Sequence, residues 1–140
     1  MKANYQDKIP KKESEVSLGN LYDMNKQIMA NEPEIDAEVL TQKKEEMMNW
    51  VNTHFAQHYF MLLCNERKDY TVFRMRDTTA TIGAIQNMVN DVIECMTNRG
   101  TLLAIDLQEA GGWELWIKSA EDGFCSAYYL FPYGAAVLEY

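Results

Sequence analysis

Two histidines, His54 and His58, lie four residues apart near the end of a predicted helix, and the chain has no others. This spacing can present both imidazole rings to one metal ion. A zinc protease also needs a glutamate directly after the first histidine, but Phe55 stands there. A metal site would have to recruit Cys64 or a carboxylate. We therefore expect no metal ion and no other cofactor.

Three cysteines are candidates for nucleophilic chemistry, which needs a nearby base that favours the thiolate. Cys64 lies in an apolar run and Cys95 beside the apolar face of a helix, where a free cysteine acts as a small hydrophobic residue. Cys125 follows a turn and is the most exposed candidate, but Asp122 nearby does not favour a thiolate. Three widely spaced cysteines are too few for a secreted disulfide scaffold. They indicate reduced thiols and a cytoplasmic protein.

The remaining short motifs predict no catalytic site. Gly111 and Gly112 lack the longer glycine spacing and the lysine of a phosphate-binding loop, so they predict a turn between strands. Adjacent carboxylates such as those at 45–46 and 121–122 are typical of a solvated surface. No catalytic signature is found, and we predict that the protein is not an enzyme.

The charge of the chain is strongly acidic, with 21 acidic residues against 13 lysines and arginines and a net charge of −8. Such a protein repels phosphate backbones, so we expect no direct binding to nucleic acid. No apolar run reaches the length that crosses a bilayer, and we expect no membrane contact. Solubility explains the acidity simply. The alternative is a surface offered to a basic partner protein.

The densest acidic run is Glu32, Glu34, Asp36 and Glu38. A linker followed by a charged helix start accounts for it, because acidic residues stabilise the first turn of a helix. A functional interpretation is that spaced carboxylates imitate a phosphate backbone for an arginine- or lysine-rich groove. Both interpretations stay open.

Aromatic residues near the C-terminus provide the second candidate surface. Trp113, Leu115 and Ile117 alternate with Glu114, Trp116 and Lys118, so Trp116 is predicted to stand on the opposite face between two charges. Of the adjacent Tyr128 and Tyr129, one must also face outward. These aromatics are either binding anchors or residues covered by a second layer. The candidate partner-binding residues are Glu32, Glu34, Asp36, Glu38, Glu114, Trp116, Glu121, Asp122 and Tyr128.

Apolar periodicity predicts the elements that position these residues. Residues 1–16 read as a flexible arm and 17–140 as a single domain. Helices are expected over 18–31, from Asp36 towards 58, and over 78–99 with Gly100 as its C-terminal cap. Strands are expected over 58–64, 70–75, 101–107, 113–119 and 126–131, with a short last one at 136–139.

The element order is thus α-α-β-β-α-β-β-β. Hairpins on both sides of one crossing helix favour an antiparallel sheet of about five strands with helices packed on one face. The predicted fold class is α+β.

Four short strings carry a resemblance to a group of proteins: Leu21–Lys26, Asp69–Phe73, Asn98–Gly100 and Tyr128–Tyr133. In these the chain resembles small acidic proteins encoded by phages and mobile elements of low-GC Gram-positive bacteria, a group that includes anti-CRISPR-type inhibitors. The resemblance implies host cytoplasm and an accessory role, and it supplies no catalytic residues.

The sequence therefore predicts a non-enzymatic protein-binding module. It would block a basic nucleic-acid-binding surface of a host defence nuclease, as an anti-CRISPR inhibitor does. The alternative is an accessory or assembly protein that acts by self-association, as a homo-oligomer, or by docking to another protein of the phage or element.

Overall fold

The computed structural model describes residues 18–54, 59–75 and 81–133, with side chains described from residue 23 onward. The predicted arm 1–16, the predicted strand 136–139 and His58 lie outside these residues. The described chain falls into two units, one ending at Glu32 and one beginning at Pro33. Each is described by itself.

The first unit contains helix α1, Leu18–Met29. It ends in a turn in which the amide groups of Ala30 and Asn31 bond to the carbonyl groups of Lys26 and Ile28. The helix stops there because Pro33 follows, and proline disfavours helical backbone at the residue before it.

The second unit opens with helix α2, Ala37–Thr53. Asp36 is its N-cap, and its carboxylate accepts a hydrogen bond from the amide of Glu38 at 3.0 Å. This cap satisfies one of the amide groups that a helix start leaves without a partner. Met47, Trp50 and Val51 form the buried face, as the apolar spacing predicts.

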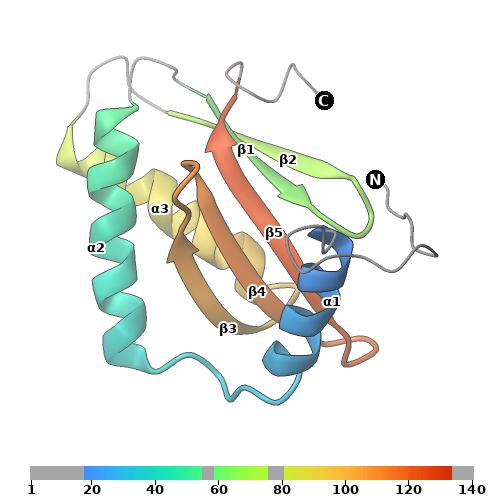
Figure 1. Cartoon of the computed structure of the whole chain (residues 1–140). Coiled ribbons are helices and arrows are strands. Elements are labelled where there is room, and N and C mark those ends of the chain that lie inside the picture. The colour runs from blue at the N-terminus through green and yellow to red at the C-terminus, as the bar shows by residue number, and fades with distance from the viewer. Residues whose placement is uncertain (1–17, 55–58, 76–80, 134–140) are drawn as a thin grey trace. The chain divides into compact units, whose positions relative to one another are not determined.

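Five strands form one antiparallel sheet in the order β2-β1-β5-β4-β3 (Figure 1). Their bounds are β1 Tyr59–Cys64, β2 Tyr70–Arg74, β3 Gly100–Leu107, β4 Trp113–Ser119 and β5 Cys125–Pro132. The β1–β2 hairpin and the β3–β4–β5 meander are joined where β1 pairs with β5, with Leu62 opposite Leu130. The predicted α+β class and element order are confirmed.

Helix α3, Ile82–Thr97, crosses between the two hairpins and is N-capped by the hydroxyl of Thr81. Its inner face is buried as predicted, but Ile82 is exposed, because it lies in the first turn and points away from the core. The prediction that Gly100 caps this helix is wrong. The C-cap is Asn98, and Gly100 is the first residue of β3.

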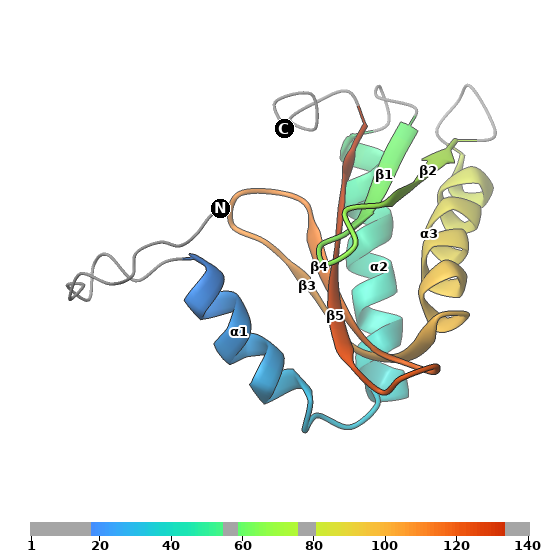
Figure 2. The same ribbon diagram turned by 90° about the vertical axis from the view of Figure 1, so that its right-hand side faces the viewer.

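Helices α2 and α3 pack on the same face of the sheet (Figure 2). Their inner faces meet one face of every strand in a single apolar core, and this core positions the strand ends described below. Its largest fully buried side chains include Trp113, Tyr128, Phe60, Met47 and Leu62.

Trp116 stands on the opposite face of the sheet, as the alternation along β4 predicts. Its neighbours Leu115 and Ile117 belong to the core beneath the helices, whereas Trp116 does not. Trp116 is nevertheless only 2% exposed. Side-chain alternation identifies the face of a strand but not what covers that face. Of the two alternatives left open for Trp116, the structure shows the covered one.

Candidate functional site

The acidic run after Pro33 is docked on the edge of the sheet. The amide of Ile35 donates to the carbonyl of Leu102 in edge strand β3, at 2.9 Å, and the Ile35 side chain packs against the core. Glu34, Asp36 and Glu38 are all exposed around this anchor. The backbone hydrogen bond therefore fixes where the three carboxylates stand.

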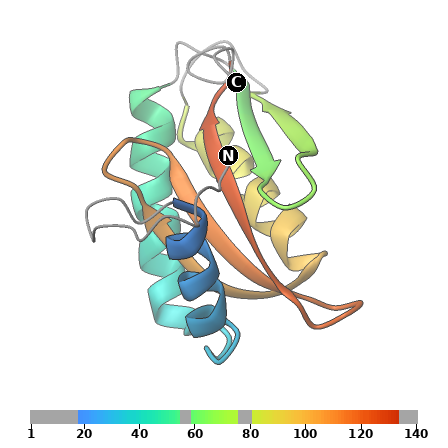
Figure 3. The same cartoon turned by 45° about the vertical axis from the view of Figure 1, so that its right-hand side comes forward.

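A second pair of predicted acidic residues, Glu121 and Asp122, lies at the same end of the sheet. Both are exposed in the β4–β5 turn. Leu102 is paired with Ile117, close to the end of β4 that leads into this turn. Strands are about 4.8 Å apart, so the two acidic groups flank the same sheet end. Figure 3 shows the start of α2 and the β4–β5 turn at this end.

We call Glu34, Asp36, Glu38, Glu121 and Asp122 the acidic end. None of these carboxylates forms an ion pair with another described residue. By contrast, the described cation nearest along α2, Lys43, is paired with Asp106 at 3.4 Å. The acidic end therefore presents negative charge that the described surface does not neutralise.

Three other predicted residues are not brought into this group. Glu32 is exposed but closes the first unit. Glu114 is half-buried on β4, where it accepts a hydrogen bond from the hydroxyl of Tyr129 at 3.1 Å. Trp116 is buried on the same face of the sheet.

Tyr128 is not an outward aromatic. It faces the helices, is 2% exposed and belongs to the core, while Tyr129 is the half-buried member of the pair on the other face. The prediction of Tyr128 as an exposed binding residue is wrong, because the register of β5 turns its side chain towards α3.

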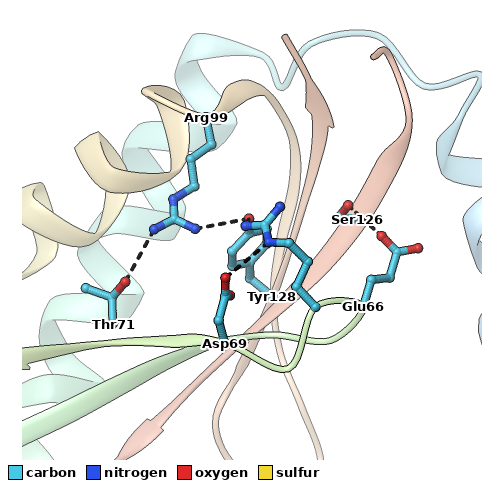
Figure 4. A network of polar contacts seen from close by, with 7 residues as sticks. Glu66, Asp69, Thr71, Arg99, Ser126 and Tyr128 are labelled. Carbon is cyan, nitrogen blue, oxygen red and sulfur yellow. Dashed lines mark hydrogen bonds and ion pairs between the residues drawn. The ribbon is translucent and has the colours of Figure 1, made fainter. Parts of the chain in front are cut away.

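The hydroxyl of Tyr128 instead marks a cluster that sequence reasoning missed. It accepts a hydrogen bond from Nη2 of Arg67 at 2.9 Å and another from Nη1 of Arg99 at 3.2 Å (Figure 4). Nothing in the spacing of these residues indicates the contact, because Arg67 and Tyr128 are 61 positions apart in the chain.

Arg67 is presented by the β1–β2 turn. Lys68 has a left-handed backbone, with φ of 61°, which bends the turn after Arg67. Nε of Arg67 donates to Asp69 at 3.2 Å, and this hydrogen bond is the main cause that raises the pKa of Arg67. Glu66, the residue before Arg67, accepts a hydrogen bond from the hydroxyl of Ser126 at 2.7 Å.

Arg99 comes from the end of α3 and is half-buried. Its guanidinium lies 5.4 Å from the centre of the Tyr128 ring, and its Nη2 donates to Thr71 at 3.3 Å. The hydrogen bond to Tyr128 is the main cause that raises the pKa of Arg99, against the lowering effect of burial. No described carboxylate forms an ion pair with it.

Arg67, Arg99 and Tyr128 line a pocket of about 340 Å³ at the end of the sheet. Two arginines and one acidic residue, Glu121, are its charged members, which reverses the acidic balance of the whole chain. Apart from Ile117 and Ala120, the other residues of the wall carry uncharged polar groups. They are Asn98, Ser119, Ser126 and Tyr128.

The described residues considered for metal binding or nucleophilic chemistry form no such site. Nδ1 of His54 lies 3.0 Å from the carbonyl of Trp50, and no described group of three ligands could hold a metal ion. All three cysteines are free thiols. Cys125, expected to be the most exposed, is buried at the start of β5.

Comparisons with protein-family models, with curated proteins and with solved structures each find no match to this chain. Among the described helices, none combines the length and the apolar character that a bilayer span requires.

Proposed function

We propose that the protein is a non-enzymatic module that binds the basic surface of another protein through its acidic end. The observation that carries the proposal is the gathering of exposed carboxylates from two distant chain segments at one end of the sheet, where no described cation pairs with them. Such a surface steers a basic partner towards it and repels acidic ones.

The partner that this surface suits best is a nucleic-acid-binding protein, because its basic groove is shaped to receive spaced negative charges. Within the proposal, the protein occupies that groove on a host defence nuclease in the host cytoplasm, as an anti-CRISPR inhibitor does. The docked backbone at Ile35 supports this proposal. It holds Glu34 and Asp36 in place before binding, which lowers the entropy lost on association.

The test compares two variants in which exposed carboxylates become neutral amides, five at the acidic end in the first and three elsewhere in the control. The first carries Glu34→Gln, Asp36→Asn, Glu38→Gln, Glu121→Gln and Asp122→Asn, where asparagine keeps the helix cap at 36. The control carries Glu45→Gln, Glu46→Gln and Glu94→Gln, three exposed residues on the outer faces of α2 and α3. Each variant and the parent are immobilised, partners are captured from the host, and binding kinetics are measured with the purified partner.

We expect the first variant to associate at least about tenfold more slowly than the parent and to lose most of its dependence on salt, because charge steers encounter. The control should lose much less. Equal association rates for the parent and the first variant would refute the proposal, and the acidity would then serve solubility.

A second candidate function is assembly by self-association, and one observation favours it. Strand β2 forms an edge of the sheet, and Tyr59, Tyr70 and Val72 are exposed on one face of the β1–β2 hairpin. An apolar contact there would be insensitive to salt. Sedimentation of the parent and of Val72→Lys across protein concentration separates this function from the first.

A further inference from the structure

The cavity between the β1–β2 turn, the end of α3 and the β4–β5 turn is lined by polar groups that converge from all three segments. Two arginines line this cavity although the chain as a whole is strongly acidic. Arg67 has a carboxylate partner in Asp69, whereas the half-buried Arg99 has none among the described residues. The partners given for the Arg99 guanidinium are the hydroxyls of Tyr128 and Thr71 and the side chain of Cys95, and none of them is a carboxylate.

The two guanidinium groups also have donors to spare. Each carries five N–H groups. Within the described chain, Arg67 uses Nε and Nη2, and Arg99 uses Nη1 and Nη2. Arg99 also hydrogen-bonds to the side chain of Cys95. The remaining donors, including Nη1 of Arg67, lie on two different groups that share one hydroxyl acceptor. Serine hydroxyls at 119 and 126 line the same pocket.

We propose that this pocket binds a phosphate group. A carboxylate pairs best with two parallel N–H groups on one edge of a single guanidinium. Here the remaining donors come from two guanidinium groups, since each group already gives part of its N–H groups to Asp69, Tyr128 or Thr71. A tetrahedral phosphate has several oxygens that accept hydrogen bonds from different directions, so it suits donors on two separate groups.

The surroundings select a single phosphate group over a nucleic-acid backbone. Glu121 lines the pocket, and Asp122 lies next to it in the turn. These carboxylates repel an extended polyanion more strongly than a single phosphate group, because the polyanion brings several negative charges close to them. The site differs from the function proposed above in using cations, although Glu121 belongs to both the pocket and the acidic end.

The test follows backbone amide signals by NMR while inorganic phosphate is added at constant ionic strength. We expect shifts at Asn98, Arg99, Ala120 and Tyr128. Arg99→Gln should weaken phosphate binding by about tenfold or more, since a charge-assisted hydrogen bond contributes about 1.5–3 kcal/mol. Arg74→Gln is the matched control, because Arg74 is exposed on β2 and its strand position faces away from the pocket. Arg67→Gln, in an exposed turn, serves as a second variant if Arg99→Gln does not fold.

Three further additions complete the test. Phenyl phosphate and a phosphoserine peptide distinguish a free small molecule from a phosphorylated side chain, and the tighter of the two identifies the source of the group. Acetate tests the choice of phosphate over carboxylate. The proposal is overturned if phosphate causes no shift, if acetate binds as tightly, or if the parent, the arginine variants and Arg74→Gln respond alike.

Discussion

Arg67 and Arg99 meet at one oxygen atom, the hydroxyl of Tyr128, although one arginine lies in the β1–β2 turn and the other at the end of α3. Two like charges this close repel each other, so the shared acceptor and Asp69 must offset that repulsion. This contact ties the hairpin, the crossing helix and β5 together at one point.

Removing the Tyr128 hydroxyl should weaken the contact between the two arginines and β5 but leave the apolar core packed. Tyr128→Phe keeps the ring but leaves both arginines without this hydrogen bond. We expect unfolding in urea to show a loss of about 1–3 kcal/mol. Tyr70→Phe removes the same atom from an exposed ring and should change stability by less than about 0.5 kcal/mol. Equal effects in the two variants would contradict the role of the Tyr128 hydroxyl.

Gly100 is predicted to tolerate no side chain. A Cβ atom there would lie 2.9 Å from the carbonyl carbon of Lys118 and 3.0 Å from the Cα of Ser119, both backbone atoms of the paired strand. Gly100→Ala should therefore lower the melting temperature strongly. Gly83→Ala is the matched control, because a Cβ at this helical position meets nothing within 4 Å. It should leave stability unchanged or raise it by up to about 1 kcal/mol.

Asp36 has a structural role as the N-cap of α2 and a proposed functional role in the acidic end. Two substitutions separate these roles. Asp36→Ala should destabilise the fold by about 0.5–2 kcal/mol, because the amide of Glu38 loses its acceptor. Asp36→Asn retains an acceptor oxygen and should melt like the parent. If asparagine is as harmful as alanine in thermal unfolding, the charge of Asp36 rather than its cap matters to the helix.

We expect Trp116 to contribute mainly to the stability of the fold. Its side chain is 2% exposed, so Trp116→Ala should cost about 3–5 kcal/mol in unfolding free energy. Tyr70→Ala removes an aromatic ring that is 58% exposed and should cost far less. A Trp116→Ala variant that melts like the parent would show that this ring is accessible in solution.

We expect the protein to fold without a bound metal ion. The ring of His54 lies beside the Trp50 ring, with centroids 4.8 Å apart, and its Nδ1 faces the Trp50 carbonyl. Treatment with a chelator should leave the melting temperature unchanged. A fall of several degrees that zinc reverses would mean that the protein contains a structural metal ion.

Local patterns predict the elements of this fold because they depend on neighbours in the chain. The apolar spacing over α3 and the alternation along β4 give the correct inward faces. The wrong predictions concern residues at the ends of elements and the question of what covers a face of the sheet. Ile82 continues the apolar spacing into the first turn of α3, which lies outside the core. Gly100 follows the helix because β3 begins there and its backbone lies close to the backbone of β4.

The two candidate sites differ in how much of each can be predicted from neighbouring residues in the sequence. The acidic residues of 34–38 and 121–122 stand out by composition, and only their meeting at one sheet end requires the fold. The arginine pocket has no local signal at all. Arg99 and Tyr128 are 29 positions apart, and they meet because the register of β5 points Tyr128 towards the end of α3.

The position of β5 between β1 and β4 also sets the order of events during synthesis. Each hairpin can form from nearby residues, but the ladder between Met61 and Phe131 waits until β5 has left the ribosome. Until then β1 keeps an unpaired inner edge with apolar side chains on both faces. The nascent chain is thus most prone to aggregation after β1 and before β5, and a chain that ends before residue 125 should not complete its folding.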